Sequence, residues 1–261
     1  MATLNLTPIE DPTCGVELKP LRHYLAPRWW PAWIAAGIIR AVSALPLAAV
    51  RPLAAVLGRL AYWVALRDRK TTLINLRLAY PTLSPSEVRR RAIRHFESLA
   101  YSLWETGLVW YGAAERLRKI SRLEGVEHLH AAAAAGRGVL LLGAHFTTNE
   151  IAAAIRPHAG LPCDVMYKRS RNALIEQLAL HGRLGKGGRM VPSDKFVEML
   201  KTLKRGGIAL YAPDQRFDGD GYVVVPLFGV PALSNPGTTF IARATRCAVL
   251  PFFPERLEDG S

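Results

Sequence analysis

The stretch GAHFTTNE, residues 143–150, places one histidine and one glutamate close together between an apolar run and an alanine-rich run. An imidazole can take a proton from a hydroxyl group, and a carboxylate held against it can orient the ring and stabilise its charged form. On one continuous helix His145 and Glu150 would lie about 140° apart, but they can converge if His145 precedes the helix and Glu150 lies in its first turn. The same residues also fit a capping box, with Thr147 as N-cap and Glu150 as its partner. The spacing alone leaves both alternatives open.

Further polar side chains follow two other runs that are expected to be strands. These candidate substrate-binding residues are Lys168, Arg169, Arg171, Asp214 and Gln215. Because ligands bind where the carboxyl ends of parallel strands meet, we expect these residues to share one rim with His145. The sequence therefore predicts a site at that edge of a sheet.

The elements that would position this site come from an alternation of short β-rich runs and helical runs after residue 119. We expect strands near 119–123, 138–143, 163–168, 207–211, 222–228 and 247–252. We expect helices near 125–135, 148–156, 171–184, 194–205 and 236–245. This alternation predicts an α/β fold with a largely parallel sheet flanked by helices. Upstream, Ser84 and Glu87 form a capping-box pattern with Pro85 at the first helical position, which predicts a helix running to about Tyr111.

Residues 29–66 are apolar almost throughout and follow a leader, residues 1–28. Arg40 at the centre of a spanning helix would cost roughly 2.5–3.5 kcal/mol, and Pro46 breaks the helical pattern. We therefore favour a membrane-associated helical region whose helix lies in the interface, with Arg40 and Arg51 on one face, over a clean span. An internal helical hairpin of a soluble protein is the alternative. Linking helices at 67–118 and an α/β core at 119–261 would follow, and the abrupt end after a strand leaves truncation of the core open.

The charge balance favours an anionic partner. The chain has 34 Lys and Arg against 21 Asp and Glu, a formal net charge of +13, and residues 168–205 alone carry ten basic and three acidic side chains. A second hypothesis is therefore a catalytically silent domain that binds a membrane or a polyanion through residues 168–205. Nucleic acid is not expected as a partner, because this block lacks interleaved aromatic residues and no recognised module is present.

Several chemistries lack their motifs. The chain contains no G-x-S-x-G elbow, no phosphate-binding G-x-x-x-x-G-K-[ST] loop, no H-E-x-x-H and no dinucleotide fingerprint. Its three cysteines lie far apart without C-x-x-C spacing, so neither a disulfide framework nor a zinc site is indicated. We expect no metal and no cofactor.

Taken in order, several segments resemble the bacterial lipid A biosynthesis late acyltransferases, the lauroyl/myristoyl transferase branch of the lysophospholipid acyltransferase superfamily. LAPRWWPAWIAAGIIRAVSALP resembles the membrane anchor of the family, and NLRLAYPTLSPSE and HFESLAYSLWETG resemble its linking helices. GAHFTTNE is similar to its H-x-x-x-x-[DE] motif, and YAPDQ with VPLFGVPA to its acceptor-side block. The order and spacing of these segments carry the resemblance.

The resemblance implies transfer of a fatty acyl chain from acyl carrier protein, or from coenzyme A, to a hydroxyl of a membrane glycolipid. His145 would be the general base and Glu150 its orienting carboxylate, while Arg169 and Arg171 would hold a lipid phosphate or phosphopantetheine. The acceptor would be a lipid A precursor or another glycolipid, such as a phosphatidylinositol mannoside. The enzyme would act at the bacterial inner membrane, on its cytoplasmic side. Gln215 departs from the family pattern, because many relatives have histidine there.

Overall fold

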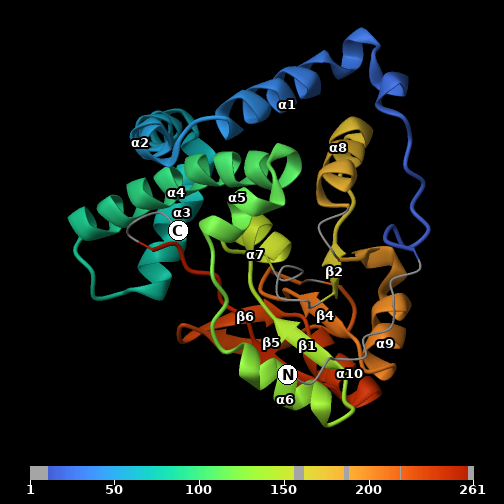
Figure 1. Cartoon of the computed structure of the whole chain (residues 1–261). Helices are drawn as coiled ribbons and strands as arrows, with labels where there is room; N and C mark the ends of the chain where they lie inside the picture. Colours follow the sequence, from blue (N-terminus) through green and yellow to red (C-terminus); the bar gives the residue numbers. More distant parts are fainter. Residues whose placement is uncertain (1–10, 156–161, 185–187, 218, 258–261) are drawn as a thin grey trace.

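The computed structural model describes residues 11–155, 162–184, 188–217 and 219–257, which form an α/β core beneath a layer of helices (Figure 1). Five parallel strands form the sheet in the order β3 (Met190–Pro192), β2 (Cys163–Tyr167), β4 (Ile208–Tyr211), β1 (Val139–Leu142) and β7 (Ala248–Pro251). The interior strand β1 is apolar throughout, and Val139 and Leu140 are fully buried, as expected for a parallel strand covered on both faces. The predicted α/β class and largely parallel sheet are confirmed.

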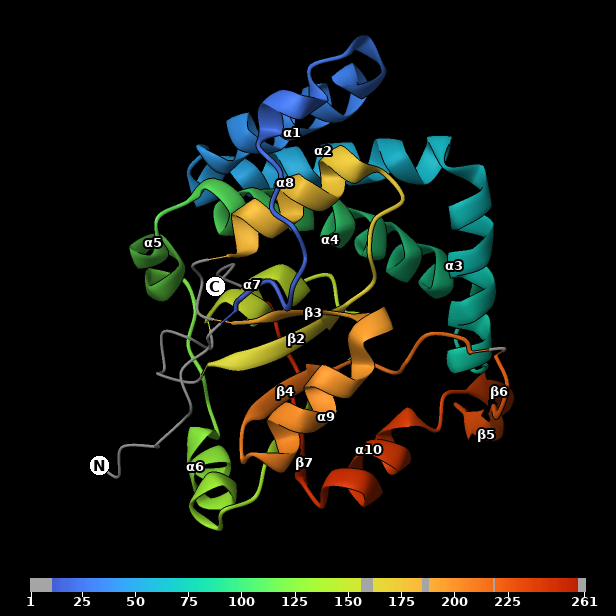
Figure 2. The same ribbon diagram turned by 90° about the vertical axis from the view of Figure 1, so that its right-hand side faces the viewer.

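Helices cover both faces of this sheet, as Figure 2 shows. One face carries α9 (Phe196–Lys204) and α10 (Gly237–Thr245), and the other carries α6 (Val126–Ala134) and α7 (Asn149–Ile155). The helix α8 (Ala173–Arg183) and the short α5 (Ala114–Lys119) extend this second layer, and the 3-10 turn η4 (Ser193–Lys195) leads into α9. Buried Leu140, Leu203 and Ile241 belong to one core cluster that joins the sheet to α9 and α10.

The long helix α4 (Pro85–Tyr111) joins the core to the N-terminal helices. It starts at the predicted capping box, in which the Ser84 hydroxyl accepts from the Glu87 amide and the Glu87 carboxylate accepts from the Ser84 amide. The N-terminal helices α1 (Trp30–Ser43), α2 (Leu47–Val64) and α3 (Leu66–Ala79) pack against it. Glycine makes the closest approaches possible, because a Cβ on Gly58 would collide with the backbone of Glu97 and one on Gly107 would lie 2.6 Å from the carbonyl oxygen of Ile39.

The apolar N-terminal region is two helices, so the expectation of one uninterrupted helix with Arg40 and Arg51 on a shared face is wrong. The break falls at residues 44–46, because Pro46 opens α2 and its predecessor is biased away from helix. α2 is the one helix of the described residues that is long and apolar enough to cross a membrane, by length and composition only. Its face toward α4 is buried, whereas Leu60, Trp63 and Val64 are more than half exposed.

The described part of the expected leader is packed against the core. The amide of Met190 donates to the carbonyl of Pro12 at 2.9 Å, and Gln177 on α8 bonds to the backbone of both Glu17 and Lys19. Two 3-10 turns, η1 (Leu21–Tyr24) and η2 (Pro27–Trp29), then lead into α1. Residues 1–10 lie outside the described part of the chain.

Two strand expectations need correction, and one strand of the main sheet was missed. Residues 119–123 are not a strand, because the short helix α5 occupies the chain as far as Lys119 and only two apolar residues follow. The three-residue edge strand β3 was too short to be recognised from sequence. Residues 222–228 form no part of the main sheet; instead β5 (Val223–Leu227) pairs with β6 (Val230–Ser234) in a separate antiparallel hairpin.

Candidate active site

The imidazole of His145 is hydrogen-bonded to the carboxylate of Asp214. Nδ1 of His145 lies 2.6 Å from one carboxylate oxygen, and the His145 amide donates to the other oxygen at 2.9 Å. Strand register explains the pairing: Leu142 on β1 is paired with Tyr211 on β4, and each site residue lies three positions beyond its strand. Two neighbouring parallel strands thus deliver a histidine and an aspartate to the same point.

This geometry selects the ring nitrogen that is available for chemistry. An ionised carboxylate only accepts hydrogen bonds, so Nδ1 of His145 is the donor to Asp214, and in the neutral ring Nε2 carries the lone pair. The side chains of His145 and Asp214 are 48% and 38% exposed, so Nε2 can be reached by a substrate. The pair has the arrangement of a general base with its orienting carboxylate.

Glu150 is paired with Arg183 and not with His145 in the structure. Its carboxylate forms a two-pronged ion pair with the guanidinium of Arg183 on α8, and within the described chain no hydrogen bond joins it to His145. Its position in the first turn of α7 directs it toward α8, whereas His145 lies before the helix beside β4. The carboxylate that orients the imidazole in this structure is Asp214.

The alternative capping box at this turn is also not formed. α7 begins at Asn149, and the Thr147 hydroxyl lies 2.7 Å from the hydroxyl of Ser98 on α4. The hydroxyl of Thr148 is buried without a hydrogen-bond partner in the described residues. The turn is therefore held by contacts with α4 rather than by its own cap.

A cavity of about 450 Å³ opens beside His145. Its polar lining comprises His145, Asn149, Glu150, Lys168, Arg183 and Gln215. Much of the remaining wall is apolar and comes from the α7 alanines at 152–154 and from Val165, Met166, Met190 and Leu210. The cavity thus combines a few converging polar groups with an apolar interior, as ligand sites commonly do.

The basic side chains that were predicted to share the site after β2 lie in different places in the structure. Lys168 lines the cavity, whereas Arg169 is paired with Asp194 and Arg171 is exposed outside the cavity wall. Glu176 holds this turn by accepting from the Tyr167 hydroxyl and the Ser170 amide. Burial, followed by the hydrogen bond to Glu176, raises the pKa of Tyr167 well above its ordinary value, so this phenol is not a base.

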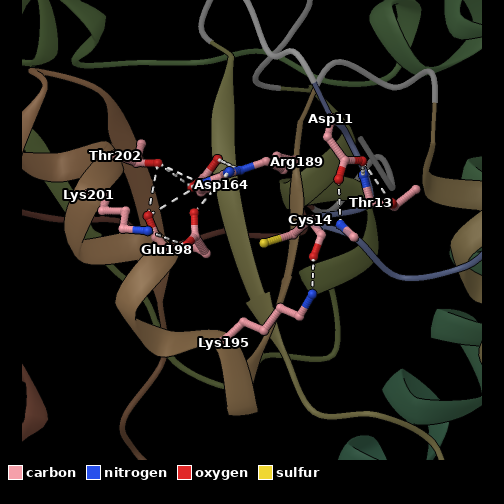
Figure 3. Close-up of polar contacts among 10 residues, drawn as sticks. Asp11, Thr13, Cys14, Asp164, Arg189, Lys195, Glu198, Lys201 and Thr202 are labelled. Atoms are coloured by element: carbon pink, nitrogen blue, oxygen red, sulfur yellow. Dashed lines mark hydrogen bonds and ion pairs between the residues drawn. The ribbon is translucent and has the colours of Figure 1, made fainter.

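Several basic residues of the block at 168–205 form ion pairs or hydrogen bonds within the protein. Arg189 binds Asp164 and the Thr202 hydroxyl, and Lys195 donates to the carbonyl of Cys14 (Figure 3). Asp164 is only 3% exposed, so this ion pair is structural. Lys186, which the sequence count included, lies outside the described residues.

The turn that carries His145 is supported from behind by residues that sequence reasoning missed. Arg256 donates to the Glu105 carboxylate at 2.8 Å and to the Ser98 hydroxyl at 2.7 Å, and Ser98 in turn contacts Thr147. The Phe146 and Phe253 rings pack edge to face. Burial raises the pKa of Glu105 even though Arg256 opposes this effect. No local motif marks these residues, because the contact spans about 150 positions.

Arg256→Ala is expected to lower the free energy of unfolding by about 3 kcal/mol, because it leaves Glu105 buried without its partner. Without the guanidinium, the pKa of Glu105 should rise further in the folded state. An acid whose pKa is raised by folding loses stability as pH rises through that pKa, so the deficit should be larger at pH 8 than at pH 5. Urea unfolding at both pH values measures it. Adding Glu105→Gln should remove the pH-dependent part; an equal deficit at both pH values in Arg256→Ala would contradict the assignment.

The described part of this site contains no cluster of metal-binding side chains. Within residues 11–155, 162–184, 188–217 and 219–257, no group of three or more His, Cys, Asp or Glu side chains is arranged to hold a metal ion. The three cysteines are buried free thiols.

Comparison with known proteins agrees with the geometry. A sequence model described as "Bacterial lipid A biosynthesis acyltransferase" matches residues 18–261. The lipid A biosynthesis lauroyltransferase of Escherichia coli K12 is 35% identical over 239 residues, which are 90% of this chain and 77% of that protein. The lipid A biosynthesis palmitoleoyltransferase of the same organism is 29% identical over 94% of this chain and 80% of its own length. The myristoyltransferase of that organism is 23% identical over 90% of this chain and 72% of its own length. The chain therefore belongs to the bacterial lipid A biosynthesis acyltransferases, a family of acyl-transferring enzymes.

Proposed function

We propose that this protein transfers a fatty acyl chain from a thioester donor, acyl carrier protein or coenzyme A, to a hydroxyl of a lipid A precursor. The observation that carries the proposal is the hydrogen bond between His145 and Asp214 at the mouth of a largely apolar cavity. Membership of the family and the names of the similar enzymes support the acceptor class.

His145 acts as the general base in this proposal, and Asp214 holds its ring. The acceptor hydroxyl oxygen attacks the thioester carbonyl carbon while Nε2 of His145 takes the hydroxyl proton. The carbon–sulfur bond then breaks, the ester forms, and the proton passes to the departing thiolate. Transfer is direct, with no acyl-enzyme intermediate.

The remaining site residues bind and position the substrates. The apolar part of the cavity takes the acyl chain, and Lys168 and Gln215 at its wall contact polar parts of donor or acceptor. Glu150 holds the guanidinium of Arg183 in the cavity wall. Two of the five N–H donors of Arg183 bond to the Glu150 carboxylate, and the remaining donors are suited to the thioester carbonyl oxygen or a phosphate. Arg169 and Arg171 lie farther out and are suited to a phosphate of lipid or carrier.

The protein works at the cytoplasmic side of the bacterial inner membrane in this proposal. The exposed apolar residues of α2 support membrane association, because a helix that is apolar on its outward face needs an apolar neighbour. A catalytically silent domain that binds anions through the basic block is less favoured. Within this block Arg183 and Arg189 form ion pairs, and Lys195 forms a hydrogen bond, inside the protein.

Membranes that carry the protein, incubated with labelled acyl carrier protein or acyl-coenzyme A and a lipid A precursor, should form an acylated glycolipid that mass spectrometry identifies. Parallel reactions with a phosphatidylinositol mannoside test the other acceptor. Salt-sensitive membrane binding without acyl product from either donor would contradict the proposal and favour the silent domain.

A further inference from the structure

The hairpin of β5 and β6 stands apart from the main sheet. It follows β4 and the Asp214 turn in the sequence. The segment that leads to it starts at the carboxyl edge of the parallel strands, where His145 also lies. In Figure 2 the hairpin lies beyond α10 and below the lower end of α3. An isolated two-stranded hairpin is marginally stable in water, so a feature of this kind requires an explanation.

The hairpin is apolar on both faces, yet β5 is exposed along its whole length and β6 is only half-buried. Residues 222–234 contain no charged side chain. Tyr222, Val224 and Leu227 are 51%, 58% and 55% exposed, and the neighbouring valines are exposed as well. A strand with water on one face normally alternates polar and apolar residues, so this pattern indicates a surface that is covered by something apolar.

The tip of the hairpin presents an aromatic ring in a conformation that costs energy. The two-residue turn has φ of 52° at Phe228 and 77° at Gly229, the positive values typical of a type I′ turn. Gly229 adopts this conformation freely, but a bulky residue such as Phe228 rarely does. Its side chain is nevertheless 65% exposed. Because the ring stays largely exposed, packing within the described chain offsets little of this strain, and the ring points to a function outside it.

The edges of the hairpin are blocked against another strand. Pro226 and Pro231 face each other across the ladder, next to the hydrogen-bonded pair that flanks the turn. At this position the amide of each residue would point outward, and proline has none, so neither edge can add a strand there. A second protein chain extending this sheet is therefore a poor occupant, whereas a lipid phase needs no backbone partner.

The surroundings of the tip combine arginine and aromatic residues, as at membrane interfaces. The Phe228 ring lies 6.3 Å from that of Tyr80 at the end of α3, and Arg91 lies 4.8 Å above the Tyr80 ring. At the other end of α3, Arg69 and Arg89 lie against Trp63 in the same way. Cationic groups around exposed aromatic rings complement anionic lipid headgroups.

We propose that the β5–β6 hairpin inserts its tip into the apolar boundary of an anionic bilayer and turns the His145 edge of the sheet toward the membrane surface. The inference extends the proposed membrane association to a second contact, separate from the N-terminal helices. Its first test requires no acyl transfer, so it can fail or succeed independently of the proposed function.

A label at the tip tests the contact directly. Phe228→Cys, carrying an environment-sensitive fluorophore, is reconstituted as the full chain in phosphatidylethanolamine/phosphatidylglycerol vesicles; the three native thiols are buried. Quencher groups on the lipid acyl chains should extinguish this label. The matched control is the same label at Phe240→Cys, another phenylalanine that is more than half exposed, on α10, which should stay unquenched.

A substitution that preserves the turn distinguishes loss of the membrane contact from unfolding of the hairpin. Phe228→Asn gives the turn the Asn-Gly sequence that type I′ turns prefer, so the hairpin should remain folded without its ring. Acylation of an acceptor embedded in vesicles should fall about tenfold, the effect of losing one buried phenylalanine, while that of a detergent-dispersed acceptor stays unchanged. Phe240→Gln should change neither rate.

Two outcomes would overturn the inference. One is a tip label that stays accessible to water and unquenched in vesicles. The other is a tip label that becomes protected without lipid as protein concentration rises, which would identify a second copy of the chain as the occupant. If labelling shows insertion but no variant acylates lipid, the contact stands and the proposed function fails.

Discussion

His145→Ala is expected to lower acyl transfer by about 10²–10⁴-fold, the contribution of a positioned general base. At 25 °C this corresponds to roughly 3–5 kcal/mol of barrier. The loss should appear in kcat with little change in KM, because the imidazole acts on the hydroxyl proton and not on binding of the acyl chain. Initial rates with a labelled donor and a lipid A precursor measure it.

The structure offers a matched control for this substitution. His181 on α8 is exposed, contacts the carbonyl of Lys19 and lies outside the cavity wall, so His181→Ala should retain activity. His145 is about half exposed, so its loss should leave the unfolding temperature nearly unchanged. A His145→Ala protein that is folded and fully active would remove the base from the mechanism.

Asp214→Asn is expected to be nearly as severe, with a loss on the order of 10²–10⁴-fold. The amide keeps the size of the carboxylate, but its NH₂ group can donate to Nδ1, which favours the tautomer with the proton on Nε2. That tautomer has no lone pair on Nε2 for the acceptor hydroxyl. The effect should therefore fall on kcat.

The tautomer itself distinguishes Asp214 from Glu150. Nitrogen NMR of ring-labelled histidine, assigned by the resonances missing from His145→Ala, should show the proton of His145 on Nδ1 in the unsubstituted protein and on Nε2 in Asp214→Asn. Glu150→Gln removes the charge that holds Arg183 and should leave this tautomer unchanged, whatever it does to turnover. A tautomer switch in Glu150→Gln, and none in Asp214→Asn, would restore Glu150 as the orienting residue.

Local sequence patterns predicted the helices and strands whose formation depends on residues close to one another in the chain. The helix from Pro85 to Tyr111 followed from its capping box and from proline at its first position, and β1 followed from its uninterrupted apolar run. His145 was correctly expected between a strand and a helix. The break at Pro46 was visible in the sequence, although the apolar region was still expected to hold one interfacial helix.

Pairings between distant segments could not be read in the same way. The contact of His145 with Asp214 depends on β1 and β4 being neighbours and on their register, although sixty-nine positions separate the two residues. Glu150 was favoured because it is close in sequence, but its side chain follows α7 toward Arg183. The hairpin misled prediction for a different reason: its apolar run has the pattern of a strand buried on both faces, although it is exposed.

The strand order has a consequence for how the chain is made. The interior strand β1 pairs with β4 and β7, so the sheet stays incomplete until residues 248–251 have been synthesised. The apolar helix α2 ends at Val64, and at 5–20 residues per second the ribosome needs roughly 10–40 s more to reach β7. During that interval α2 has no finished core beneath it. Early capture of the N-terminal helices by a bilayer or a chaperone would therefore protect the nascent chain from aggregation until β7 has been synthesised.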